Sequence, residues 1–344
     1  MTALQQQGRA AKAATYTLAT AGTAKKNAAL AAIADILTER QAEWLAANAE
    51  DVAAAKAAGM RSAMLDRLTL TTERVAGIVD GVRQVAALPD PIGKVDKMET
   101  RPNGLIIGRR RVPLGVIAII FEARPNVTVD AAALCLKSGN VCILRGGKEA
   151  IRSNRCVAEL MREALRSVGL PEDCISLVQD TSHETANELM HLDGYVDVLI
   201  PRGGAGLIRA VAKEASVPVI RTGEGVCHIY IDDEADLDMG AKILFNAKCS
   251  RPSVCNAVEC VLVHRDVAAD FWKRALPLLD EKGVELRADG EALEILGPRA
   301  IPAEEADWDA EYDDYILAVR TVGGMDEAIG FINAHGTQHS EAII

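Results

Sequence analysis

The sequence has no long run of apolar residues and no apolar block near its start. A membrane helix needs roughly 18 apolar residues in succession, and the closest stretch, 131–144, is broken by Lys137, Ser138, Gly139 and Asn140. The first residues, MTALQQQGRAAKAATYTLA, lack the apolar core of a secretory signal peptide. We therefore expect a cytoplasmic protein that does not span a membrane.

Positive charge is also scarce. Lysine and arginine number 38 against 49 aspartates and glutamates, so the formal net charge is -11. A nucleic-acid binder normally carries a basic surface that displaces counterions from phosphate. We therefore expect no nucleic-acid partner, and we interpret the basic run 109–111 as a solvated strand face.

The eight cysteines include no CxxC pair, which argues against a structural zinc site. Without a signal peptide, a disulfide framework is not expected either, and most cysteines should be small core residues. His335 and His339 are four residues apart, but Gly336 lies between them and no carboxylate motif accompanies them. We predict no metal site.

Neither a GxGxxG fingerprint nor a GxxxxGK[ST] loop is present, so neither a standard Rossmann site nor a P-loop is indicated. Apolar residues make up 49% and charged residues 25% of the 344 residues. This balance is typical of globular proteins, and the length suggests two domains.

The first ninety residues have helical periodicity. Three helices are predicted there: one from near Lys25 with Thr23 as its cap, one through Trp44 to Gly59, and one from a cap at Thr71 and Thr72 to just before Leu88. Residues 98–112 are typical of a two-stranded ribbon with its turn at Pro102, Asn103 and Gly104.

From Pro113 onward, short apolar runs alternate with helical segments. Strands are predicted at 115–121, 141–145, 174–178, 196–200 and 218–220, with helices at 127–137, 149–168, 184–191 and 206–215. A second unit begins near Cys227, with strands at 227–232 and 258–263 and helices at 236–247 and 266–277. This alternation indicates an α/β protein with doubly wound parallel sheets. Because the chain stops after an apolar run at 342–344, we expect the second sheet to be incomplete.

Ligands of parallel sheets bind at the carboxyl ends of the strands. Two predicted strands lead there into glycine-rich turns, 146–148 and 203–206, which can bring a phosphate to the backbone N–H groups of a helix. Cys255 follows a predicted helix in a polar turn near Arg251, a setting that favours a thiolate. Cys249 and Cys260 are its rivals, although Cys260 lies within a predicted strand.

Five segments in order carry a resemblance to a known family: FEARPNVT (121–128), LRGGKEA (144–150), RTGEGVCHIYIDDEADLD (221–238), NAKCSRPSVCNAVE (246–259) and HGTQHSEAI (335–343). Together they resemble the gamma-glutamyl phosphate reductases of the aldehyde dehydrogenase superfamily. The resemblance implies two Rossmann-like domains and a small β-hairpin oligomerisation arm. The implied NADP-binding domain is 1–97 with 113–225, the arm is 98–112, and the catalytic domain is 226–344.

The resemblance also implies residue roles. Cys255 matches the catalytic nucleophile, and Asn126 matches the asparagine that forms an oxyanion hole with the Cys255 backbone N–H. The cofactor-binding matches are Arg145, Gly146, Lys148, Gly203, Gly204 and Glu311. Lys148 replaces the glutamate of NAD-preferring relatives and favours NADPH. Arg124, Arg202 and Arg251 are the candidates for binding the substrate's phosphate or α-carboxylate, and the sequence does not decide among them.

Thr222 stands where hydrolytic relatives have a general-base glutamate, and Glu224 is the alternative base. The implied activity is NADPH-dependent reduction of L-glutamyl 5-phosphate to L-glutamate 5-semialdehyde through a Cys255 thioester, the second step of proline biosynthesis. A homo-oligomer and an association with glutamate 5-kinase are implied as well. The competing hypotheses are an NAD-dependent semialdehyde dehydrogenase and a shortened, non-catalytic chain that only binds nucleotide or partners.

Overall fold

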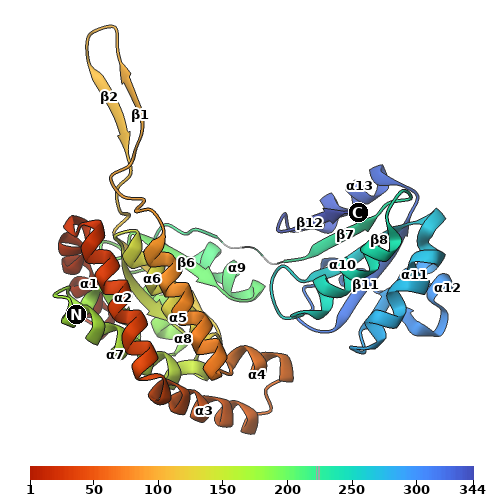
Figure 1. Ribbon diagram of the computed structural model, residues 1–344, viewed down its shortest axis with the longest axis horizontal. Coiled ribbons are helices and arrows are strands. Elements are labelled where there is room, and N and C mark those ends of the chain that lie inside the picture. Colours follow the sequence, from red (N-terminus) through yellow and green to blue (C-terminus); the bar gives the residue numbers. More distant parts are fainter. Residues whose placement is uncertain (222, 224) are drawn as a thin grey trace. The chain divides into compact units, whose positions relative to one another are not determined.

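The computed structural model describes residues 1–221, 223 and 225–344. The chain divides into two compact units, with the boundary between residues 222 and 223 (Figure 1). None of the helices in the described residues combines the length and apolarity needed to cross a bilayer.

The first unit contains a parallel sheet of four strands in the order β5-β4-β3-β6, a separate hairpin of β1 and β2, and nine helices among its described residues. Its helices are α1 Ala3–Thr20, α2 Thr23–Glu39, α3 Gln41–Ala57, α4 Ser62–Leu68, α5 Thr72–Ala87, α6 Pro125–Lys137, α7 Ile151–Ser167, α8 His183–Met190 and α9 Ala205–Glu214. Its strands are β1 Val95–Thr100, β2 Ile106–Arg110, β3 Val116–Phe121, β4 Val141–Arg145, β5 Ile175–Leu177 and β6 Val198–Arg202.

The second unit contains a sheet of six parallel strands in the order β10-β9-β11-β8-β7-β12. Its strands are β7 Cys227–Ile231, β8 Val258–His264, β9 Glu285–Ala288, β10 Ala300–Pro302, β11 Ile316–Val322 and β12 Glu341–Ile343. Its helices are α10 Leu237–Cys249, α11 Arg265–Asp280, α12 Gly290–Leu296 and α13 Met325–His335.

Strand β3 explains why the first sheet forms where it does. All six of its residues, VIAIIF, are buried, because it is a central strand with helices packed on both faces. An uninterrupted apolar run suits such a position, whereas an edge strand exposed to water would alternate. The predicted strands at 115–121, 141–145, 174–178 and 196–200 and the predicted helices between them are confirmed within a few residues.

Two local predictions are wrong. Residues 218–220 form no strand, and only Val219 makes an isolated parallel bridge to Leu199. Pro218 has no N–H to donate to a ladder, which explains why the pairing does not extend. Helix α2 begins at Thr23 itself, with Gly22 as its N-cap, because the Thr23 hydroxyl bonds to Asp90 Oδ2 at 2.7 Å instead of capping the helix.

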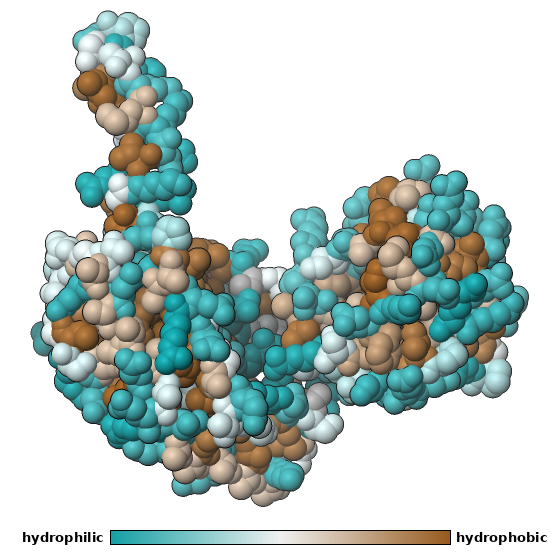
Figure 2. Space-filling view, viewed as in Figure 1, coloured by the Kyte–Doolittle hydropathy of each residue, from teal (hydrophilic) through white to brown (hydrophobic). Residues whose placement is uncertain are grey.

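The hairpin is confirmed, although its first strand begins at Val95 rather than at 98. Gly104, with φ at 84°, closes the turn, and Arg101 N–H donates to the Leu105 carbonyl at 2.8 Å. Every residue of β1 and β2 is exposed. Apolar side chains are therefore held in solvent, as Figure 2 shows on the extended ribbon; they are Val95, Met98, Leu105, Ile106 and Ile107.

Candidate functional site

The candidate nucleotide half of the site lies at the carboxyl ends of β3, β4 and β6, which are adjacent strands. The 3-10 turn Lys148–Ala150 follows β4, and α9 follows β6. Neither has a side-chain cap at its start, where Gly147 and Gly204 are the N-cap residues. Uncapped N-termini leave backbone N–H groups that favour anions. The arrangement suits the phosphates of a dinucleotide.

Two of the predicted glycines lie close to neighbouring side chains. A Cβ on Gly146 would lie 2.2 Å from Asn154 Nδ2, a buried side chain that also accepts a hydrogen bond from Thr128. A Cβ on Gly203 would lie 2.7 Å from Glu122 Cδ. A side chain at Gly146 would displace the buried Asn154, so close packing requires glycine there, whereas a side chain at Gly203 would meet the exposed and flexible Glu122.

Lys148 and Arg145 leave β4 in different environments. Lys148 is exposed and forms no salt bridge with the part of the chain that the structure describes, so its charge is available to a phosphate. Arg145 is half-buried and donates from Nη2 to the carbonyls of Thr181 and Ser182, at 2.6 and 3.0 Å. Burial lowers the pKa of its guanidinium. Arg145 thus joins the end of β4 to the loop after β5.

Glu122 is a site residue that the sequence analysis missed. Its Oε2 accepts a hydrogen bond from the Gly204 backbone N–H at 3.1 Å. The carboxylate of Glu122 therefore occupies the Gly204 N–H, a donor that would otherwise be available to a pyrophosphate. The position directly after β3 was the available signal, because residues there face the ligand edge of a parallel sheet.

Asn126 lies in the first turn of α6, directly after Pro125. It is half-buried, and its Nδ2 donates to Asp130 Oδ2 at 2.9 Å, which fixes the amide along the helix. The amide group has two N–H bonds, so one remains for a ligand. Of the predicted substrate arginines in this unit, Arg124 is half-buried and Arg202 is exposed.

The candidate nucleophile lies in the second unit, in the loop 250–257 between α10 and β8. Cys255 is half-buried, whereas its two rivals are buried. Burial raises the pKa of the Cys249 thiol at the end of α10 and that of Cys260 within β8. A raised thiol pKa disfavours the thiolate that attacks a carbonyl. Among these three cysteines, Cys255 is the one suited to chemistry.

The backbone of Cys255 is held by close contacts from the segment that leads into β7. A Cβ on Gly225 would lie only 1.6 Å from the Cys255 carbonyl oxygen, so only glycine fits there. The Cys227 thiol donates to the same oxygen at 3.3 Å. Burial raises the pKa of Cys227 to about 12, which keeps it a protonated donor. These contacts fix the peptide at Cys255.

Glu311 lies beside this segment, because its Oε1 accepts from the Gly225 backbone N–H at 3.2 Å. The structure therefore brings Cys255, Gly225 and Glu311 together. Two further side chains hold the same segment: Thr337 accepts from Val226 N–H at 3.0 Å and Glu341 from His228 N–H at 2.8 Å. Both residues belong to the HGTQHSEAI segment, but no local pattern in the sequence indicates these two roles.

The remaining predicted residues are also located. Arg251 is exposed at the start of the cysteine loop. His335 Nδ1 lies 2.8 Å from Asp309 Oδ1, and His339 Nδ1 lies 2.9 Å from Ser340 Oγ. The expected general-base position Thr222 and its alternative Glu224 lie outside the described residues.

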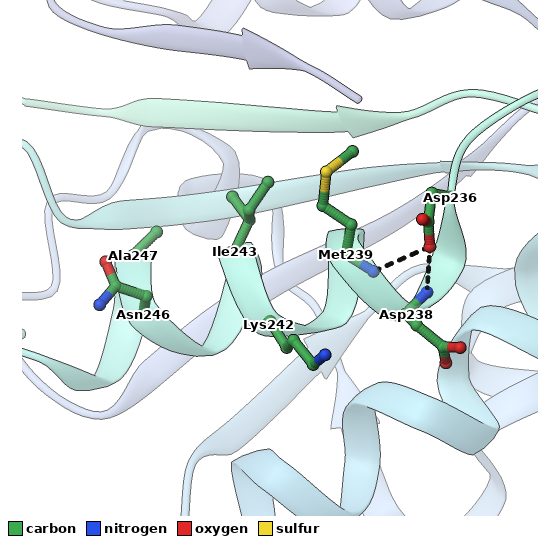
Figure 3. A pocket seen from close by; sticks show the side chains of 7 residues that line it. All are labelled: Asp236, Asp238, Met239, Lys242, Ile243, Asn246 and Ala247. Atoms are coloured by element: carbon green, nitrogen blue, oxygen red, sulfur yellow. Dashed lines mark hydrogen bonds between the residues drawn. The ribbon is translucent and has the colours of Figure 1, made fainter.

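A hollow of about 490 Å³ runs along the outer face of α10. All the side chains drawn in Figure 3 come from this helix and its cap, and Asp236 Oδ1 accepts from the backbone N–H groups of Asp238 and Met239. Met239 is 49% exposed and Ile243 37% exposed. The lining contains no cysteine or histidine, so we do not assign the chemistry to this hollow.

Comparisons with known proteins agree with this geometry. The model of the aldehyde dehydrogenase family matches residues 2–291. A gamma-glutamyl phosphate reductase of Clostridium perfringens (strain 13 / Type A) is 54% identical over 338 residues, covering 98% of this chain and 81% of the relative. One of Enterococcus faecalis (strain ATCC 700802 / V583) is 53% identical over 344 residues, covering 100% and 82%. The crystal structure of a gamma-glutamyl phosphate reductase from Thermotoga maritima matches with a TM-score of 0.91 at 41% identity, covering 99% of this chain and 82% of that one.

Proposed function

Because the chain belongs to the aldehyde dehydrogenase family, and within it to the gamma-glutamyl phosphate reductases, we propose that it reduces L-glutamyl 5-phosphate to L-glutamate 5-semialdehyde and phosphate. The product is the semialdehyde of proline biosynthesis. One observation carries the proposal: the partly exposed thiol of Cys255 on a peptide fixed by Gly225 and Cys227.

Cys255 is the proposed nucleophile. Its thiolate attacks the acyl carbon of the substrate, the bond to the phosphate oxygen breaks, and a thioester to Cys255 remains. The free N–H of the Asn126 amide and the Cys255 backbone N–H donate to the oxyanion that forms during attack. Arg124, Arg202 and Arg251 are the proposed ligands of the substrate's phosphate and α-carboxylate. Position 222 carries threonine in place of the general-base glutamate of hydrolytic relatives, so no carboxylate at this position activates water against the thioester.

The family uses a nicotinamide cofactor, and we propose that this chain prefers NADPH. When bound, the cofactor supplies the hydride that reduces the thioester. Lys148 is exposed and forms no salt bridge with a described residue, so its charge suits a 2′-phosphate. The turn at Gly203 and Gly204 would hold the pyrophosphate, with Arg145 and Gly146 beside it, and Glu311 would hold the nicotinamide ribose.

The wider organisation is proposed on the same basis. Residues 1–97 and 113–225 form the NADP-binding domain, and 226–344 form the catalytic domain. The exposed hairpin, whose strands span 95–110, is the oligomerisation arm predicted at 98–112, because its unpaired edges and apolar side chains need a partner. A homo-oligomer in the cytoplasm and association with glutamate 5-kinase, which would deliver the labile acyl phosphate directly, complete the proposal.

The test runs the reaction in reverse with the purified chain. Glutamate 5-semialdehyde, phosphate and NADP should yield NADPH, detected by its absorbance, and Cys255→Ser should abolish the signal. Cys249→Ser is the matched control and should retain activity, since this buried thiol has a raised pKa. A clear preference for NAD, or turnover that does not depend on phosphate, would identify a semialdehyde-oxidising dehydrogenase instead.

A further inference from the structure

The loop that carries Cys255 is closed at its base by a buried ion pair. Lys248, at the end of α10, lies 2.6 Å from Glu259 on β8, and their side chains are 0% and 1% exposed. Burial raises the pKa of Glu259 to about 7 and lowers that of Lys248, and their mutual attraction opposes both shifts. Charges removed from water in this way are costly, and an apolar pair of similar size is often as stable or more stable. Stability alone therefore does not account for the pair.

Lys248 and Glu259 both lie near residues 312 and 313, which follow Glu311 in the chain. Lys248 Nζ lies 5.9 Å from the centre of the Tyr312 ring, and Arg287 Cζ lies 5.2 Å from the same ring. Asp313 acts on Glu259 in two opposing ways: its carboxylate charge raises the pKa of Glu259, whereas its backbone N–H favours the ionised form and lowers that pKa. Asp313 has a φ of 56°, in the left-handed region that is uncommon for residues other than glycine. The pair thus lies beside two successive residues of a turn with an unusual backbone.

Two separate sets of contacts connect the cysteine loop to the segment that contains Glu311. Glu311 precedes Tyr312 and accepts from the Gly225 backbone N–H at 3.2 Å. Gly225 packs directly on the Cys255 carbonyl, and the chain then runs from Cys255 to Glu259 within four residues. The cysteine loop and the Glu311 segment are therefore joined on one side through Gly225 and on the other through the buried pair.

We infer that Lys248 and Glu259 are positioning residues that fix Glu311 relative to Cys255. The inference rests on the proposed function, in which Glu311 holds the nicotinamide ribose and Cys255 holds the acyl group. The pair acts through residues 311–313. It keeps the carboxylate of Glu311 in place for the cofactor and does not contribute to the stability of the fold as a whole.

The experiment replaces the pair by apolar residues of similar volume, Lys248→Met with Glu259→Leu. The thermal midpoint should stay at the wild-type value, because no unpaired charge is left behind. The rate at which iodoacetamide alkylates Cys255 should stay within about threefold of the wild-type rate. The dissociation constant of NADPH, from its fluorescence, should rise about tenfold, and turnover should fall at least as much, because displacement of a contact by about 1 Å is costly.

Combining the apolar double variant with Glu311→Gln tests whether the pair affects NADPH binding through Glu311. If the pair acts through Glu311, its replacement in a Glu311→Gln background should weaken NADPH binding by less than about twofold further, since coupled sites are not additive. Unchanged NADPH affinity in the apolar variant, or losses that multiply with Glu311→Gln, would overturn the inference. Should the apolar variant not fold, Tyr312→Leu keeps the pair and should still weaken NADPH binding, and wild-type affinity there would also overturn the inference.

A matched control and the wild-type chain separate the two claims. Lys26 is buried and pairs with the partly exposed Asp90 at 2.6 Å in the first unit, and replacing both charges, Lys26→Met with Asp90→Leu, should keep wild-type NADPH affinity. Absence of wild-type turnover with semialdehyde, phosphate and NADP refutes the proposed function itself. Wild-type turnover together with an unaffected apolar variant refutes only the positioning role.

Discussion

Gly225→Ala should inactivate the enzyme through a single methyl group. The new Cβ would lie 1.6 Å from the Cys255 carbonyl oxygen, whereas non-bonded heavy atoms rest roughly 3.5 Å apart. The two backbone segments must therefore separate by about 1.9 Å, and the Cys255 peptide moves with them. Misplacement of a reacting group by about 1 Å can cost about 100-fold in rate, so we expect kcat to fall by about 100-fold or more.

The assay is semialdehyde oxidation with phosphate and NADP, with circular dichroism to establish that the variant is folded. Gly223→Ala is the matched control, because a Cβ there meets no atom of the described residues within 4 Å; it should keep kcat within about twofold. A folded Gly225→Ala enzyme with wild-type kcat would refute the claim that this contact holds the nucleophile in place.

Three further predictions follow from the charges. Lys148→Glu replaces attraction to a 2′-phosphate by repulsion, so NADPH should bind about 30-fold more weakly, at about 2 kcal/mol, while NADH affinity stays nearly constant in the same fluorescence titration. Glu122→Gln keeps the bond to Gly204 but removes a negative charge from the pyrophosphate turn, so NADPH should bind about threefold to fivefold more tightly; weaker binding would contradict this role. Burial lowers the pKa of His228 to about 4, below its value of about 6.5 in an unfolded chain. The unfolded state then binds the extra proton, so the free energy of unfolding should have its full value above pH 6.5 and fall as the pH drops toward 4. The fall should stay below about 3 kcal/mol, because Glu341 Oε2 lies 3.3 Å from His228 Nδ1 and its charge favours the protonated ring. His228→Phe should flatten the dependence of the thermal midpoint on pH.

The sheet of the first unit could be predicted because its signals are local. The apolar run of β3 and the glycine-rich turns after β4 and β6 can each be recognised from a few consecutive residues. The capping box of Thr2 and Gln5 at the start of α1 was legible too, although the sequence analysis did not use it. The bridge at Val219 and the Asp90 partner of Thr23 depend on residues far along the chain, so those two predictions failed.

The site was predictable in its chemistry but not in its contacts. Cys255 could be preferred over Cys260 because a polar turn differs from an apolar strand. The contact of Gly225 with Cys255 joins residues thirty positions apart, and the bond of Glu122 to Gly204 has a separation of 82. The Lys248–Glu259 pair looks in sequence like two ordinary surface charges. Their burial follows from the packing of α10 and β8, which no local pattern records.

The central claim is that Cys255 carries the acyl group as a thioester released by phosphate. The most direct measurement mixes the chain with glutamate 5-semialdehyde and NADP while phosphate is withheld. We predict a single burst of NADPH, close to one equivalent per chain, and a mass increase on the peptide that contains Cys255; phosphate added afterwards should restart turnover. Steady NADPH production without phosphate, or an adduct on any other residue, would contradict the account.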